Sequence, residues 1–188
     1  AGLVLFLGAH SISIVAEPWR DRMAARLGAG PWKGLYGLAS LVGLTLIAVG
    51  YAHARTEPTV LFEPPAALRH AVLLLLLPVF PLLLSTYLPG RISAAAKHPM
   101  LLATKLWAFS HLLVNGGLHD LALFGGFLAW GVVDRISMKR RVPRPVPAAP
   151  PGPMNDAIAV ILGLALYVAF VLKLHLLLIG VAPISFGG

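Results

Sequence analysis

Seven histidines and no cysteines limit the chemistry open to this 188-residue chain. His10, His111 and His175 lie inside segments that are otherwise apolar. An ionisable side chain in such a segment costs free energy, so interior histidines often mark functional sites. Trp107, His111 and Asn115 recur every four residues, which predicts an aromatic ring, an imidazole and an amide along one helix face. We take these five residues as candidate cofactor-binding residues.

Two imidazoles from different helices suit a six-coordinate haem iron, because helical bundles commonly hold cofactors between their helices. Zinc is a competing interpretation, but it requires further ligands. Hydrogen bonds between helices are a third interpretation, which residue spacing does not exclude. The absence of cysteine removes disulfides, thiolate ligands and cysteine nucleophiles from consideration. His/His ligation is therefore the simplest cofactor hypothesis.

The other histidines favour structural roles. His53, His70 and His119 stand near helix ends, where interfacial polar residues are common. His98 precedes Pro99, which is typical of the start of a helix. Asp120, next to His119, either orients an imidazole or is simply solvated.

The elements that carry these residues are long apolar segments. Hydrophobic residues make up 58% of the chain, charged residues only 12%, and the mean hydropathy is +0.83. These values indicate an integral membrane protein, and backbone in lipid must be helical when no barrel alternation is present. We predict an all-α polytopic bundle, one domain over 1–188, with about six transmembrane helices near residues 1–16, 34–53, 68–88, 100–114, 118–133 and 157–182.

Basic residues gather in alternate loops, which predicts cytoplasmic loops after the first, third and fifth helices and both termini outside. The net charge of +8 is then a topology signal and not a sign of nucleic-acid binding. The proline-rich segment 142–153 predicts an extended cytoplasmic linker before the last helix. The loops predicted on the outer side of the membrane hold only Arg55 and Arg69. The three predicted cytoplasmic loops hold Arg20, Arg22, Arg26, Lys33, Arg91, Lys97, Arg135, Lys139, Arg140, Arg141 and Arg144.

Four blocks of sequence resemble the NnrU family: GAHS at 8–11 and the segments 19–38, 98–141 and 173–183. That family is related to the plant and cyanobacterial 15-cis-zeta-carotene isomerases, membrane proteins that bind haem b and convert a cis double bond of a polyene to trans. The resemblance implies haem b here, with His10 and His111 as metal ligands and catalytic residues. The isomerases carry a cysteine three residues before the second histidine, where this chain has Ala108, so a thiolate switch is impossible.

Three functions remain open from the sequence. The first is a bis-histidine haem b protein of the bacterial inner membrane that supports nitric oxide or nitrite metabolism in denitrification, the setting that gave the family its name. The second is a haem-dependent cis–trans isomerase, with a carotenoid or other apolar polyene as partner. The third is a cofactor-free structural or transport bundle. The lipid bilayer is a partner in all three, and the sequence predicts no oligomeric state.

Overall fold

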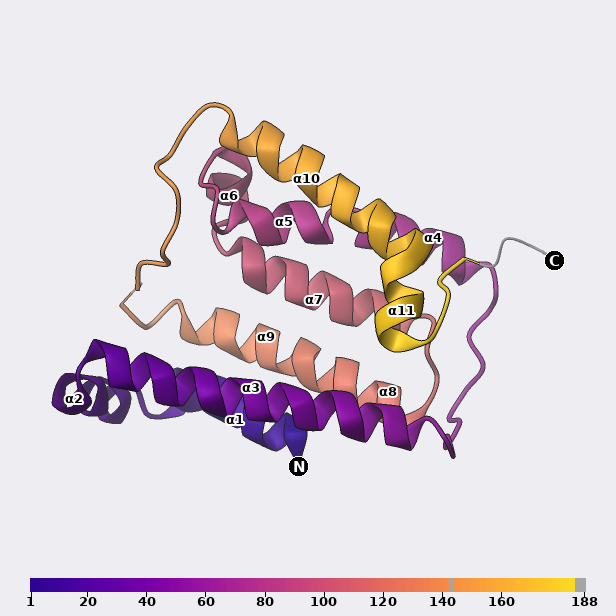
Figure 1. Ribbon diagram of the computed structural model, residues 1–188, viewed down its shortest axis with the longest axis horizontal. Coiled ribbons are helices and arrows are strands. Elements are labelled where there is room, and N and C mark those ends of the chain that lie inside the picture. Colours follow the sequence, from indigo (N-terminus) through magenta and orange to yellow (C-terminus); the bar gives the residue numbers. More distant parts are fainter. Residues whose placement is uncertain (143, 185–188) are drawn as a thin grey trace. The chain divides into compact units, whose positions relative to one another are not determined.

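The computed structural model describes residues 1–142 and 144–184, and 72% of the chain is helical. The described residues contain no β-strand, only an isolated antiparallel bridge between Val60 and Gly117. The prediction of an all-helical protein is confirmed. The residues fall into two compact units, each made of two stretches of chain (Figure 1). Unit 1 comprises Ala1–Glu63 and Gly116–Val142, and unit 2 comprises Pro64–Asn115 and Pro143–Gly188.

Unit 1 is built on the long helix α3 (Ala29–Ala54). Helix α1 (Gly2–Val15) runs antiparallel along α3, since Gly2 lies against Ile47 while Gly43 lies against Phe6. A Cβ atom on Gly43 would meet the Phe6 backbone nitrogen at 2.9 Å, so the two helices approach backbone to backbone. The second stretch of unit 1 adds α8 (Leu118–Asp120), the π-helical segment η1 (Leu121–Gly125) and α9 (Gly126–Ser137), which packs on α1.

Helix α2 (Glu17–Leu27) follows α1 after a bend of 101° and is seen nearly end-on beside α3 in Figure 1. The sequence predicts only a basic loop here, because charged residues break the apolar pattern. Pro18 near the start of the helix, and acidic and basic residues at its opposite ends, nevertheless favour a helix. The rings of Trp19 and Trp32 lie 6.2 Å apart, and the Arg20 guanidinium lies 5.7 Å from the Trp32 ring. This helix has the basic and aromatic composition of a membrane interface.

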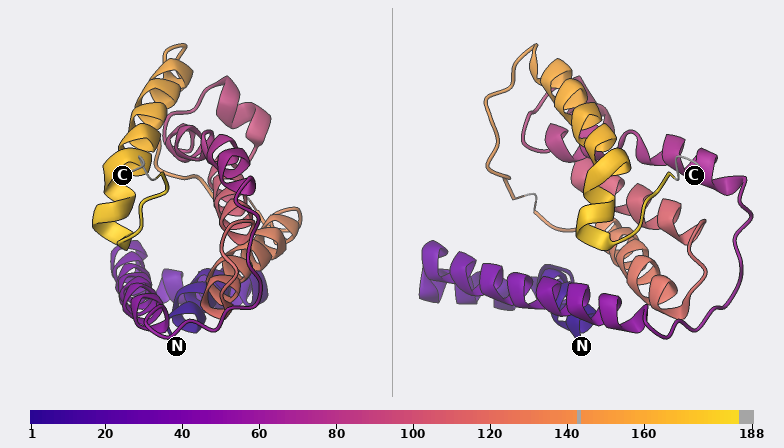
Figure 2. Two further views of the ribbon diagram at one scale, coloured as in Figure 1. Left: turned by 90° about the vertical axis from the view of Figure 1, so that its right-hand side faces the viewer. Right: turned by 45° about the vertical axis from the view of Figure 1, so that its right-hand side comes forward.

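Unit 2 is organised around α5 (Val79–Ser85), on which both α7 (Pro99–Leu112) and α10 (Asn155–Ala169) pack (Figure 2). Its core contains Val79, Leu82 and Ala103. Gly163 of α10 lies directly on Pro81 of α5. The remaining elements are α4 (Leu68–Leu76), α6 (Arg91–Ala96), the π-helical segment η2 (Phe170–Leu174) and α11 (His175–Ile179).

The linker before α10 carries no helix or strand over residues 144–152, as its prolines predicted, while Pro143 lies outside the described residues. Two side chains at the start of α10 attach it to neighbouring turns. The Asn155 amide donates to the carbonyls of Pro89 (2.8 Å) and Pro150 (3.0 Å). The Asp156 carboxylate accepts the N–H groups of Arg91 (2.8 Å) and Ile92 (3.0 Å) at the start of α6.

Among the described residues, three continuous helical stretches are long and apolar enough to cross a membrane: Ala29–Ala54, Leu68–Ser85 and Asn155–Ile179. The bent pair Gly2–Val15 and Glu17–Leu27 makes four if it counts as one span. Helices α1 and α7 have 14 residues each, about 21 Å, and a bilayer core is about 30 Å thick. The prediction of helices suited to cross a membrane is confirmed for three, or up to four, helical stretches among the described residues, whereas the six spans and the outside location of both termini stay predictions.

Candidate functional site

His111 lies in the last turn of α7, one turn after Trp107. Its Nδ1 atom lies 2.9 Å from the Trp107 carbonyl oxygen, and the two ring centroids are 5.3 Å apart. A carbonyl only accepts hydrogen bonds, so Nδ1 carries the proton, and a metal on this ring would bind through Nε2. Trp107 in turn packs against the core of unit 2, which fixes the turn that holds His111. The predicted pairing of ring and imidazole on one helix face is present.

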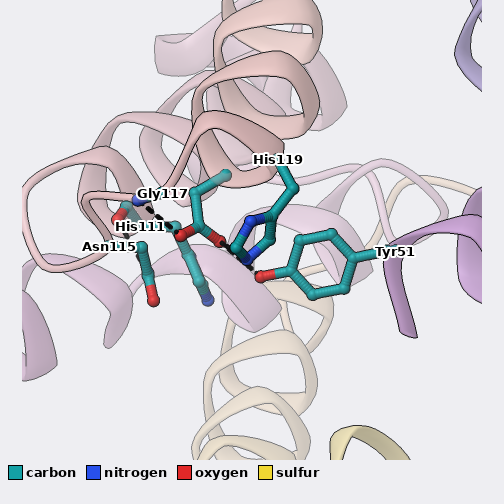
Figure 3. A network of polar contacts seen from close by, with 6 residues as sticks. Tyr51, His111, Asn115, Gly117 and His119 are labelled. Atoms are coloured by element: carbon teal, nitrogen blue, oxygen red, sulfur yellow. Dashed lines mark hydrogen bonds and ion pairs between the residues drawn. The ribbon is translucent and has the colours of Figure 1, made fainter. Parts of the chain in front are cut away.

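Asn115 lies beyond the end of α7, which stops at Leu112, so it does not continue the helix face that its spacing suggested. Its amide Nδ2 donates to the His111 carbonyl oxygen at 2.8 Å (Figure 3). The same carbonyl also accepts the backbone N–H of Asn115 at 3.0 Å, so Asn115 holds the end of the helix through two of its groups. Asn115 therefore stabilises the turn that carries His111, and its direct contact with a cofactor stays a prediction.

His175, the third candidate on an apolar segment, is the first residue of α11 and follows the π-helical segment η2. Its Nδ1 lies 2.7 Å from the Val181 carbonyl oxygen. Gly180 makes this contact possible, because its φ of 78° reverses the chain after α11. The His175 and His111 ring centroids are 6.5 Å apart, with an angle of 17° between the ring planes. Unit 2 thus brings together two of the predicted cofactor-binding histidines.

His10 belongs to unit 1 and lies among aromatic rings of that unit. Its Nδ1 is 2.8 Å from the Phe6 carbonyl oxygen, and its ring stacks on Phe6 with centroids 4.2 Å apart. Tyr36 and Trp130 approach from two other helices at 5.1 and 5.9 Å. The buried Trp130 Nε1 has no hydrogen-bond partner among the described residues, so this cluster holds an unused donor. The predicted sharing of one iron by His10 and His111 stays a prediction.

A second polar cluster, in unit 1, centres on Asp120, which is 6% exposed. The carboxylate accepts the Tyr51 hydroxyl at 2.5 Å and the Gly117 N–H at 3.0 Å, and His119 Nε2 lies 3.6 Å from it (Figure 3). The sequence left two roles open for Asp120, orienting an imidazole or being solvated. Its burial excludes the solvated role. Tyr51 was missed, because nothing in the sequence connects residues 69 positions apart. The cluster joins the end of α3 to the start of α8.

Three other histidines lie at or near the ends of helices, and their predicted structural roles stay predictions. His53 and His70 are exposed. His98 precedes the first residue of α7, as its position before Pro99 predicted. No group of three or more His, Asp or Glu side chains arranged to hold a metal ion occurs in the part of the chain that the structure describes. Haem needs only two protein ligands, since its macrocycle supplies the other four, whereas a structural zinc ion needs more.

The fold defines an all-helical membrane protein with imidazoles held in both of its units. A model of the NnrU protein family matches residues 1–183, and the chain belongs to that family. No curated protein and no solved structure matches the chain.

Proposed function

We propose that this NnrU protein is a haem b-binding protein of the bacterial inner membrane. One observation carries the proposal: His10, His111 and His175 each hold Nδ1 against a backbone carbonyl, at 2.8, 2.9 and 2.7 Å. Metal-binding histidines are usually oriented in this way, with the second ring nitrogen bonded to an oxygen atom of the protein. The three imidazoles therefore have the tautomer and the fixed orientation that an axial ligand requires.

The resemblance to the isomerases names His10 and His111 as the axial ligands. The surroundings of His10 fit a cofactor with polar groups, because the buried Trp130 Nε1 is a hydrogen-bond donor without a partner among the described residues. The centroids of the His10 and Trp130 rings are 5.9 Å apart. His111 is fixed by the Trp107 carbonyl and by the Asn115 amide on its own carbonyl. A bound haem supplies reversible one-electron chemistry, which suits a role in nitrite or nitric oxide metabolism by electron transfer or by sensing.

For the topology we propose six crossings with both termini outside. The short helices α1 and α7 pack along α3 and α5, which belong to stretches long and apolar enough to span, so each short helix shares the membrane slab of its neighbour. The excess of arginine and lysine in alternate loops supports the orientation. Exposed leucines and valines along α3 and α10 suit contact with lipid chains.

The test is a visible absorption spectrum of the detergent-purified protein after haem-replete expression. We expect the intense bands of a six-coordinate low-spin haem, lost in His111→Ala and unchanged in the matched control His53→Ala, whose side chain is exposed on α3. A protein without haem bands would refute the proposal and favour the cofactor-free bundle. Anaerobic conversion of a 15-cis polyene by the reduced protein would instead assign an isomerase.

A further inference from the structure

We propose that the end of unit 1 that carries helix α2 binds the phosphate headgroups of anionic phospholipids. Helix α2 follows α1 after a bend of 101° and packs on both α1 and α3 (Figure 1). Helix α3 is long and apolar enough to cross a membrane, and α1 runs antiparallel along it. A helix that turns sharply away from two such neighbours lies along the membrane surface. None of the α2 residues is buried within the protein.

One side of α2 combines an apolar stripe with two arginines. Trp19, Met23 and Leu27 recur every four residues and therefore lie on one face of the helix. Trp19 and Leu27 are each 45% exposed. Arg22 and Arg26 follow the same spacing directly beside this stripe, and both are exposed. This is the pattern of an interfacial helix, whose apolar side chains enter the acyl chains while its guanidinium groups meet the phosphates.

The two arginines beside the stripe carry charges that acidic side chains do not neutralise. Arg22 and Arg26 are four residues apart, where two like charges destabilise a helix. Arg20 is paired with Asp21 at 2.8 Å, but no salt bridge among the described residues includes Arg22 or Arg26. A phosphate group between the two guanidinium groups removes their repulsion and accepts charge-assisted hydrogen bonds from both. The charge of this face is therefore complementary to an anionic headgroup.

The end of α9 adds basic residues at the same end of unit 1. The ring pairs Phe6–Phe127 and His10–Trp130, with centroids 5.6 and 5.9 Å apart, follow the same order along α1 and α9. The two helices are therefore parallel, and the last residues of α9 lie near the junction of α1 and α2. Basic residues outnumber acidic ones by eight to three at this end, namely Arg20, Arg22, Arg26, Lys33, Arg135, Lys139, Arg140 and Arg141 against Glu17, Asp21 and Asp134.

Two tryptophans place this basic surface at the depth of the headgroups. The Trp19 and Trp32 rings meet edge to face with centroids 6.2 Å apart, and the Arg20 guanidinium lies 5.7 Å from the centre of the Trp32 ring. Indole rings favour the headgroup level of a membrane. A topology signal requires only the number of basic residues in a loop. Paired arginines beside exposed indole predict, in addition, a preference for one class of lipid.

The experiment is native mass spectrometry of the full-length protein in detergent with equal amounts of phosphatidylglycerol and phosphatidylcholine of the same chain length. We expect more bound phosphatidylglycerol than phosphatidylcholine. Arg22→Gln and Arg26→Gln should each lower this ratio about fivefold, because a basic residue near an anionic surface contributes about that much. The matched control is Arg69→Gln, which removes the same charge from an exposed position on α4 and should leave the ratio unchanged.

Equal binding of the two lipids by the wild-type protein would overturn the proposal. An equal loss in Arg69→Gln would also overturn it, because net charge alone would then explain the preference. Glycerol phosphate at the same concentration carries the headgroup chemistry without acyl chains and should not displace the lipid; displacement would overturn the assignment to a phospholipid. The ratio does not depend on whether haem is bound.

A measurement on the unmodified protein guards against variants that fail to fold. Raising the salt concentration to about 1 M shortens the Debye length to about 3 Å, which screens exposed charges. The excess of bound phosphatidylglycerol should then fall towards an equal ratio. An excess that persists unchanged at high salt would overturn the role of the exposed arginines.

Discussion

The contact between α10 and α5 allows a quantitative prediction for Gly163→Ala. A Cβ atom at position 163 would lie 2.6 Å from Cδ and 2.7 Å from Cα of Pro81, both parts of a rigid ring or backbone. Carbon atoms in contact lie about 3.5–4.0 Å apart, so α10 must move away from α5 by about 1 Å. Overpacking of this kind costs about 1–3 kcal/mol. Close approach at small residues is a main source of helix association in membranes, so the loss falls directly on unit 2.

The assay is thermal unfolding of the purified protein in detergent, followed by the loss of the monodisperse chromatographic peak. Gly37→Ala is the matched control, because Gly37 lies in helix α3 and a methyl group added there would meet nothing within 4 Å. Both variants gain about 1 kcal/mol of helix propensity, so the difference between them reports the packing cost. We expect Gly163→Ala to unfold several degrees below Gly37→Ala. Equal midpoints would refute the close packing of α10 on Pro81.

Two further substitutions test the polar contacts that fix helix ends. Asp156→Ala removes the acceptor of the Arg91 and Ile92 N–H groups at the start of α6. The loss of such a cap should cost about 1–2 kcal/mol of stability, seen as a lower unfolding midpoint. An unchanged midpoint would contradict the capping role of Asp156. Tyr51→Phe removes the hydroxyl that donates to buried Asp120 and should cost about 1–3 kcal/mol in the same assay. An unchanged midpoint in Tyr51→Phe would show that the cluster does not join α3 to α8.

The helical segments could be predicted because backbone in lipid must satisfy its hydrogen bonds internally, which leaves only helices and closed barrels. The segment 34–53 became α3, and 157–182 became the stretch from α10 to α11, each with ends shifted by a few residues. Helix α2 was missed, because a search for apolar runs ignores a helix rich in charged side chains. The π-helical segments were also missed, since they differ from α-helix in hydrogen-bond register and not in residue type.

In the candidate site, contacts within one helix could be predicted from the sequence, whereas contacts between distant segments could not. The pairing of Trp107 with His111 followed from a spacing of four residues on one helix, where geometry is set by the helix itself. The approach of His175 to His111 is a tertiary contact that depends on α5, η2 and Gly180. The spacing of residues within one helix therefore does not predict it. The hydrogen bond between Tyr51 and Asp120 is likewise invisible before folding.

The order of the two units along the chain governs how this protein is made. Unit 1 needs Gly116–Val142, but the ribosome first synthesises Pro64–Asn115, which belongs to unit 2. At roughly 5–20 residues per second, synthesis of Pro64–Asn115 takes roughly 3–10 s. During this time α1 and α3 are present without α9, which packs on α1. Neither unit is a continuous piece of polypeptide, so no single truncation yields one complete unit without part of the other. Unit 1 is complete once α9 has been synthesised, whereas unit 2 stays incomplete until α10 and α11 follow.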